Sequence, residues 1–206
     1  MELILKKILY NLHCAIIGLK EFSKHIIGDY VVTNLENRHN LQKNLISQDK
    51  WNCLVLFHDV PFNLEITFFE TAESILEELS YKDYFDIIFL TVNLAENNPL
   101  EKLQQRYEQI REFSKKDTMY ILIHFTSVEK EIQNEFNDSL ISVSKKLDML
   151  YCFLLDKSYP ELSHLFKRIL SDFEFQFKYS SPELFERAKA YGKKLSEEEK
   201  PYLEIY

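Results

Sequence analysis

The segment Gly18–His25, GLKEFSKH, has the residue types of a phosphate-binding loop at two of its four fixed positions. In the pattern GxxxxGK[ST], backbone N–H groups and a lysine bind phosphate, and a hydroxyl binds Mg²⁺. Gly18 and Lys24 match this pattern, whereas Ser23 stands where the second glycine belongs and His25 where the hydroxyl belongs. A Cβ at the second glycine hinders the close approach of phosphate, and imidazole is a poor ligand for Mg²⁺. The segment is therefore open to three interpretations: an active phosphate site, a degenerate one, or a chance match.

The composition predicts a folded chain that does not bind nucleic acid. Of its 206 residues, 46% are hydrophobic and 14% are aromatic, which is enough to build a core and argues against disorder. The 33 acidic residues outnumber the 25 basic ones, so no excess of positive charge is available to attract phosphates. Cys14, Cys53 and Cys152 lie in apolar runs without CxxC spacing, and the six histidines are scattered. We therefore expect reduced, buried cysteines and no metal site.

Neither end of the sequence carries a membrane signal. The opening segment MELILKKILY lacks a long apolar region and a small-residue cleavage site, and its charges interrupt any membrane span. The closing segment YLEIY contains no cysteine for prenylation. The sequence therefore predicts a soluble, cytoplasmic protein without a membrane anchor.

Apolar runs of strand length alternate with helical stretches along most of the chain. NCLVLFHD and NLEITFFE are strands joined by a turn at Asp59-Val60-Pro61, and so short a connection permits only an antiparallel hairpin. The other strands are almost continuously apolar, which is typical of a parallel sheet covered by helices on both faces. The predicted fold class is therefore α/β, in three layers, with a six-stranded, mostly parallel sheet and one antiparallel hairpin at its edge. The predicted strands are 12–18, 52–59, 63–70, 85–93, 118–125 and 149–155, and the predicted helices are 23–38, 99–115, 128–147, 160–173 and one that begins at Ser181 and Pro182.

This order of elements resembles that of the Ras-like small GTPases. A first strand, a phosphate-loop position, a helix, an antiparallel hairpin and strand–helix repeats follow one another over residues 12–173. Residues 85–123 are similar to that family's fourth strand, third helix and fifth strand, and residues 145–170 to its last strand, base-contacting loop and final helix. The resemblance implies a P-loop, Ras-like domain at 1–177, followed by a C-terminal helix and acidic tail at 178–206.

Carried over residue by residue, the resemblance implies a degenerate nucleotide site. Glu70 keeps a carboxylate for a metal, but Glu73 replaces the glycine that senses the γ-phosphate, and Ser74 replaces the water-orienting glutamine. The guanine-reading segment NKxD falls on Phe125–Val128, whose last residue accepts no side-chain hydrogen bond. In the last loop only Lys157 matches the family. The residues of this vestigial nucleotide site are Gly18, Ser23, Lys24, His25, Glu70, Phe125 and Lys157.

The resemblance thus implies a pseudo-GTPase that binds a protein partner and is no enzyme, with no catalytic residue, metal or cofactor. In small GTPases the hairpin is the partner-binding edge, so 52–70 is the expected binding surface, and its aromatic residues either form that surface or pack within the sheet. Two alternatives stay open. One is a divergent NTPase switch that binds GTP or GDP with Mg²⁺ through Lys24 and Glu70. The other is an unrelated doubly wound protein with a small-molecule site at the carboxyl ends of its strands.

The C-terminal residues suggest one more hypothesis. The acidic run Glu197-Glu198-Glu199, with Tyr202 and Leu203 after it, resembles the glutamate-rich export signals of bacterial type IV secretion effectors. An effector of this kind would be secreted into the cytosol of a host cell. The alternative is a plain solvated tail.

Overall fold

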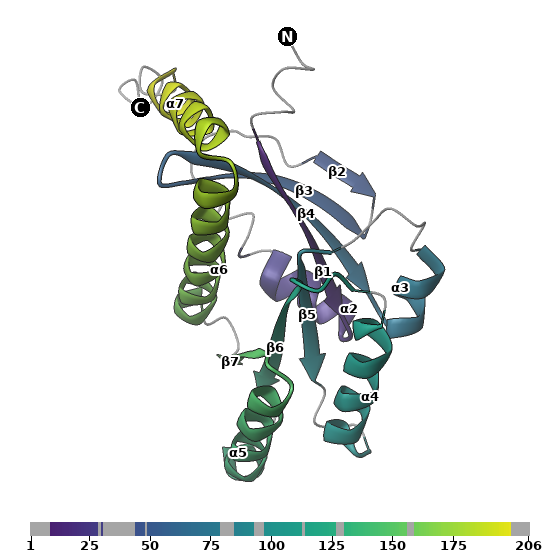
Figure 1. Ribbon diagram of the computed structural model, residues 1–206. Helices are drawn as coiled ribbons and strands as arrows, with labels where there is room; N and C mark the ends of the chain where they lie inside the picture. Colours follow the sequence, from purple (N-terminus) through teal and green to yellow (C-terminus); the bar gives the residue numbers. More distant parts are fainter. Residues whose placement is uncertain are drawn as a thin grey trace. The chain divides into compact units, whose positions relative to one another are not determined.

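The computed structural model describes residues 9–28, 30, 44–47, 49–78, 85–92, 97–112, 114–126, 130–155 and 159–198, and it shows an α/β protein (Figure 1). The strands form a seven-stranded sheet in the order β2-β3-β4-β1-β5-β6-β7. The strands are β1 (Tyr10–Ile17), β2 (Asn44–Ser47), β3 (Lys50–Phe57), β4 (Val60–Phe69), β5 (Ile87–Val92), β6 (Met119–Thr126) and β7 (Leu150–Leu155). The helices are α2 (Lys20–Ser23), the π-helical turn η1 (Lys24–Gly28), α3 (Ala72–Glu78), α4 (Pro99–Arg111), α5 (Lys130–Lys146), α6 (Tyr159–Ser180) and α7 (Pro182–Glu198).

The chain divides into two compact units, each made of separate stretches of sequence. Unit 1 contains 1–12, 30–65 and 164–206, and unit 2 contains 13–29 and 66–163. The domain boundary expected at 177/178 lies within α6, and the two units divide the chain elsewhere.

The parallel part of the sheet lies in unit 2 and agrees with the prediction. β5 pairs in parallel with β1 and with β6, and β6 pairs in parallel with β7. All six residues of β5 are buried, as are Cys14–Ile17 of β1. Strands that are apolar on both faces are stable only when helices cover both faces, and this is why the apolar runs predicted these strands correctly.

The predicted antiparallel hairpin is β3 and β4, but its turn was wrongly placed. The turn is His58-Asp59, and Val60 and Pro61 already belong to β4. Both turn residues have positive φ, 48° and 66°, which is the backbone of the two-residue turn that matches the twist of a hairpin. Pro61 was interpreted as a turn residue, yet proline is also tolerated near the start of a strand.

Two short elements were not predicted, and some helix ends differ. All six predicted strands are present, and β2 is added at the edge, paired antiparallel to β3 with a bulge between Leu45 and Ser47. The helix α3 follows β4 directly. The first helix begins at Lys20 where 23 was expected, α4 ends at Arg111 where 115 was expected, and α6 continues to Ser180 where 173 was expected.

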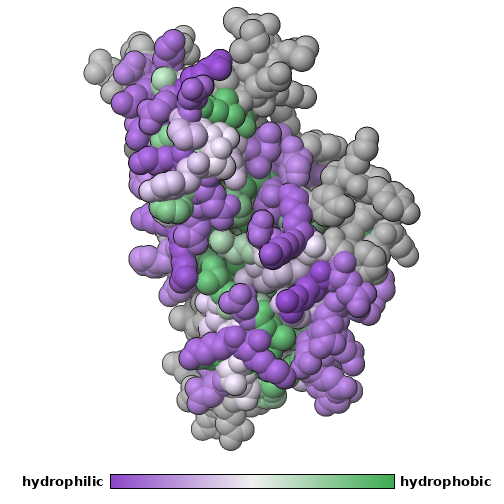
Figure 2. Space-filling model, in the orientation of Figure 1, coloured by the Kyte–Doolittle hydropathy of each residue, from purple (hydrophilic) through white to green (hydrophobic). Residues whose placement is uncertain are grey.

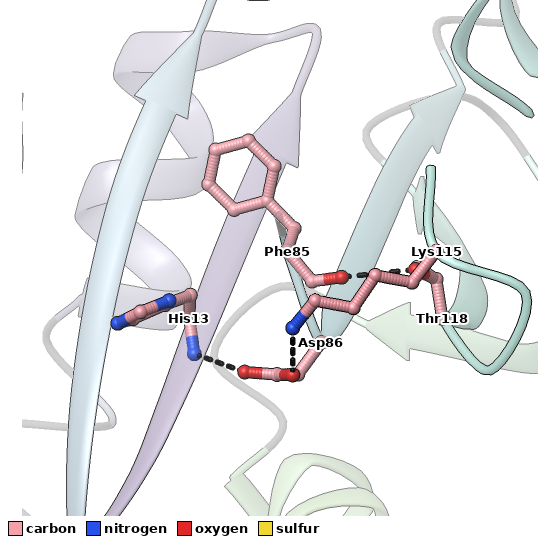
Figure 3. Close-up of polar contacts among 5 residues, drawn as sticks. All are labelled: His13, Phe85, Asp86, Lys115 and Thr118. Atoms are coloured by element: carbon pink, nitrogen blue, oxygen red, sulfur yellow. Dashed lines mark hydrogen bonds and ion pairs between the residues drawn. The ribbon is translucent and has the colours of Figure 1, made fainter. Parts of the chain in front are cut away.

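Asp86 connects three segments of unit 2 at the amino end of β5 (Figure 3). Its carboxylate accepts a hydrogen bond from the backbone N–H of His13 at 2.9 Å and one from Lys115 Nζ at 2.8 Å. Beside it, Thr118 Oγ1 donates to the carbonyl oxygen of Phe85 at 2.9 Å. These contacts fix the start of the parallel ladder. Ligands of open α/β sheets bind at the opposite, carboxyl end of the strands, so we interpret this polar cluster as structural.

In unit 1 an aromatic cluster joins β1, the hairpin and the long helices. The ring of Tyr10 lies 5.6 Å from that of Phe62 and 4.7 Å from that of Phe177, and the Phe177 ring lies 5.6 Å from that of Phe185 of α7. Only Ser181 separates α6 from α7, and its N–H donates to Phe177 O at 3.0 Å. Large aromatic rings bury much apolar area, so this cluster accounts for a good part of the stability of unit 1.

The helix α7 contacts the hairpin turn at Gly192. Gly192 of α7 is buried, and a Cβ built there would lie 1.9 Å from Asp59 O and 2.8 Å from Leu56 Cδ1. On the neighbouring helix, the carboxylate of Glu174 is within hydrogen-bonding distance of the His58 ring, with 2.9 Å between Oε2 and Nδ1. Both helices therefore contact the tip of the hairpin.

The aromatic residues of the hairpin pack inside unit 1 and unit 2. Trp51, Phe62 and Phe68 are buried, and Phe57 is half-buried. Of the two interpretations left open by the sequence, packing within the sheet therefore applies to the three buried side chains, Trp51, Phe62 and Phe68. Among the described residues, no helix is both long enough and apolar enough to cross a membrane.

Candidate functional site

The turn after β1 is the position expected for a phosphate loop, but its backbone is helical. Gly18 and Leu19 have positive φ, 84° and 41°, and the helix begins immediately after them at Lys20. The N–H of Ser23 donates to Leu19 O at 2.8 Å, and the N–H of Lys24 points at the carbonyl oxygens of the preceding turn. A phosphate loop needs these N–H groups for its anion. In this protein they are used inside the helix.

The side chains of the same segment are also engaged. Ser23 is fully buried, and its Oγ donates to Gly18 O at 3.3 Å. Lys24 Nζ lies 2.9 Å from Glu21 Oε1, and only 11% of the Lys24 side chain is exposed against 82% of Glu21. His25 is exposed. The lysine that would bind phosphate is therefore paired with a carboxylate one turn away, which opposes the binding of a second anion.

Gly18 has a structural role that does not depend on phosphate. It is buried, its N–H donates to Phe69 O at 2.9 Å, and a Cβ built on it would lie 2.8 Å from Thr91 Oγ1. The hydroxyl of Thr91 donates to Ile17 O at 2.9 Å. A side chain at position 18 would thus push into the contact between β1 and β5. The positive φ is a second reason for glycine at this position.

Glu70 and Phe125 lie at the same edge of the sheet as the Gly18 turn. Glu70 follows Phe69 and is exposed, so it lies next to the Gly18 turn. Phe125 is near the carboxyl end of β6, and β5 separates β6 from β1, so it lies two strand spacings, roughly 10 Å, from that turn. Lys157 lies outside the described residues. The structure therefore groups Gly18, Ser23, Lys24, His25 and Glu70, with Phe125 at a distance.

Two residues that the sequence did not indicate, Arg106 and Gln109, lie near Glu73 beside this turn. The pKa of Glu73 is lowered from 4.5, first by a hydrogen bond from its own backbone N–H, then by Thr71, and further by Gln109 and the positive charge of Arg106. The guanidinium of Arg106 also lies 3.7 Å from the position of a Cβ on Gly18. Arg106 and Gln109 are three residues apart on α4, beside its buried stripe, and this helical spacing is the only sequence signal for them.

The lowered pKa of Glu73 predicts how the contribution of this residue to folding stability changes with pH. A carboxylate that is stabilised in the folded state contributes to stability above its unfolded pKa, and this contribution is lost as the pH falls through the folded pKa. Because that pKa lies below 4.5, Glu73→Gln should reduce stability at neutral pH by a small amount and leave it unchanged at the acid end. Urea denaturation at a series of pH values measures this. A Glu73→Gln protein whose stability deficit is larger at acid pH than at neutral pH would contradict it.

Three other ionisable side chains, those of His124, Tyr151 and Cys152, lie on the neighbouring strands β6 and β7. His124 Nδ1 lies 3.2 Å from Tyr151 OH, which donates to Asn137 Oδ1 at 3.1 Å. Burial lowers the pKa of His124 and raises that of Tyr151 to about 12. Burial also raises the pKa of the Cys152 thiol to about 12, so this cysteine is not a nucleophile near neutral pH. We interpret these groups as part of the packing of β6 and β7.

No protein-family model matches the chain, and no curated protein matches its sequence. Among the described residues, no group of three or more histidine, cysteine, aspartate or glutamate side chains is placed to hold a metal ion.

Proposed function

We propose that this protein is a pseudo-GTPase of the Ras-like fold, which acts as a protein-interaction module and does not hydrolyse GTP. The observation that carries the proposal is the helical backbone of Lys20–Gly28 at the phosphate-loop position. In this helical backbone the N–H groups of Ser23 and Lys24 donate to carbonyl oxygens of the preceding turn and are not available to a phosphate. The ion pair between Lys24 and Glu21 supports the same conclusion.

The order of the strands supports the Ras-like part of the proposal. Without the added β2, the first strand lies between an antiparallel hairpin and three successive parallel strands. This is the arrangement that the resemblance implies. An unrelated doubly wound protein, with the order 2-1-3-4-5 or 3-2-1-4-5-6, has parallel strands on both sides of the first strand and no hairpin there.

A Ras-like domain of this kind has no device for switching. In an active GTPase the γ-phosphate orders the two switch segments, and hydrolysis releases them. Here Glu73 replaces the glycine of the second switch, and hydrogen bonding lowers its pKa, with a further contribution from the charge of Arg106. The proposed module therefore presents one constitutive conformation to its partner.

The first test of the proposal is nucleotide binding. We expect no rise in melting temperature with GTP or GDP and Mg²⁺, because the N–H groups of Ser23 and Lys24 are engaged within the helix and position 25 carries no hydroxyl. A nucleotide at 100 times its dissociation constant would stabilise the fold by about 2.7 kcal/mol, which thermal denaturation detects readily. A clear stabilisation by GTP that Lys24→Ala abolishes would overturn the proposal and favour the divergent NTPase that uses Lys24 and Glu70.

The second test concerns the binding surface, which we propose is the β2–β3 side of the sheet, within and beside the expected segment 52–70. β2 is the last strand in the sheet order, and an edge strand is a natural place for a protein partner. The bulge between Leu45 and Ser47 interrupts the regular ladder, so we expect contact through side chains of β3 and not the addition of a long strand.

Charge substitutions on β3 should therefore weaken capture of a partner. Lys50 is exposed and Leu54 is half-buried, and the two lie on the same face of the strand. The double variant Lys50→Glu and Leu54→Glu should reduce the recovery of co-purifying proteins at least tenfold, because residues at the centre of an interface contribute most of the binding energy. Affinity capture followed by mass spectrometry measures this recovery. Lys24→Ala and His25→Ala are the controls and should leave capture intact. The opposite pattern, in which only the loop variants lose capture of the partner, would mean that the loop is functional.

Export through the C-terminal residues stays a separate hypothesis, since 199–206 lie outside the described residues.

A further inference from the structure

Two large apolar side chains of α6 are exposed side by side. Phe175 is 61% exposed and Tyr179 is 68% exposed, and among the described residues they are the only large hydrophobic side chains in this state. Their ring centroids are 4.3 Å apart. Single exposed apolar residues are ordinary, but two adjacent exposed aromatic side chains indicate a contact surface. Figure 2 shows pale and green residues among the purple ones on the face to which α6 and α7 contribute.

The residues around this pair are arranged symmetrically about Phe175. Ser171 and Asp172 lie one turn before it, Lys178 and Tyr179 one turn after it, and all of them are exposed. At 100° per residue, Phe175 is the centre of the stripe, with Asp172 and Tyr179 along one side and Ser171 and Lys178 along the other. Each side thus carries one group before the centre and a complementary group after it.

We infer that this surface of α6, formed by Ser171, Asp172, Phe175, Lys178 and Tyr179, binds the same surface of a second copy of the chain in an antiparallel, two-fold pair. With the axis beside Phe175, the two Phe175 rings meet at the centre. Each Asp172 carboxylate then faces the hydroxyl of Tyr179 of the second copy, which donates to it, and each Lys178 ammonium faces the hydroxyl of Ser171. Complementary groups meet twice, as an isologous interface requires.

The choice of a second copy follows from this complementarity. A stripe that carried one sign of charge would fit a partner of the opposite sign and would repel its own copy. This stripe carries one acidic residue, Asp172, and one basic residue, Lys178. After a two-fold rotation each of them faces a hydroxyl group of the second copy. Because the contact is small and the chain carries a net charge of −8, the pair is a weak dimer.

Sedimentation of the full chain tests the association. At protein concentrations up to the order of 1 mM, in salt near 0.15 M to screen the net charge, we expect a reversible monomer–dimer equilibrium, since small interfaces are weak. Phe175→Ser together with Tyr179→Ser should raise the dissociation constant at least about tenfold, because exposed aromatics are the usual centres of binding energy. His164→Ser, on an exposed part of the same helix, is the matched control and should leave the equilibrium unchanged.

Disulfide trapping tests the register separately and keeps both aromatic residues. Ser171→Cys and Lys178→Cys are prepared as two single variants, in a chain whose native cysteines 14, 53 and 152 are buried. Oxidation of a mixture should give the mixed dimer in clear excess over either variant alone, and a mixture of His164→Cys with Lys178→Cys should not. A chain that stays monomeric at the highest concentration, an equilibrium that the aromatic substitutions do not change, or equal cross-linking in all mixtures would each overturn the inference. This outcome is independent of the proposed function, which does not require self-association.

Discussion

Gly192→Ala should destabilise the protein by about 3 kcal/mol, the size expected when an atom is forced into a packed site that cannot yield. The added Cβ would lie 1.9 Å from the carbonyl oxygen of Asp59, which is backbone, and 2.8 Å from Leu56 Cδ1. A backbone atom of a two-residue turn cannot rotate away as a flexible side chain does. The helix α7 must therefore shift from the hairpin or lose its last turns.

Helix propensity alone predicts the opposite change in stability for Gly192→Ala. Alanine stabilises the interior of a helix by about 1 kcal/mol relative to glycine, so an isolated α7 would gain from the substitution. Urea denaturation of Gly192→Ala beside Lys193→Ala, an exposed neighbour on the same helix, separates the two effects. We expect a large loss in the first variant and little change in the second. A Gly192→Ala protein as stable as the wild type would mean that α7 does not pack on the hairpin turn as described.

Gly18→Ala should cost about 2 kcal/mol, a typical sum for strain at positive φ and moderate overpacking. The φ of 84° is unfavourable for any side chain, and the new Cβ would lie 2.8 Å from Thr91 Oγ1. Lys24→Ala should cost much less, because an ion pair with an exposed carboxylate is worth about 0–1 kcal/mol. The two residues that match the phosphate-loop pattern thus differ in their importance for folding.

A double-mutant cycle tests the cause of the loss at position 18. If the hydroxyl of Thr91 is the obstacle, Gly18→Ala and Thr91→Ala should be less destabilising together than the sum of the two single changes. Denaturation by urea of the four proteins measures this coupling. Strict additivity, or a larger effect of Lys24→Ala than of Gly18→Ala, would show that the glycine is retained for a reason other than packing.

The sequence predicted the long elements well because their signal is strong. β5 and β6 are nearly continuous apolar runs, and α5 and α7 have a clear helical period. β2 has four residues and α3 has seven, which is too short for either period to be recognised. The hairpin was found, but its turn was placed at Pro61 because proline is a common turn signal, while the positive φ of His58 and Asp59 has no strong sequence mark.

The sequence placed Gly18 and Lys24 between the first strand and the first helix, and the structure has them there. Ser23, however, was judged only as a poor substitute for glycine. In the structure it is the small buried residue of a helical stripe that continues at Ile26 and Ile27, and this spacing was visible in the sequence. Arg106 reaches the same turn from more than 80 positions later, a contact that no local pattern can indicate.

The central place of β1 in the sheet has a consequence for how the chain folds during synthesis. β1 is made first, yet its neighbours are β4 and β5, and His13 meets Asp86 across a separation of 73 residues. The strand must wait, unpaired and largely apolar, while the ribosome makes the hairpin and then β5. At 5–20 residues per second, roughly the speed of translation, this delay lasts several seconds. The apolar run NLHCAII is therefore the segment with the greatest need of protection by a chaperone while the chain is incomplete.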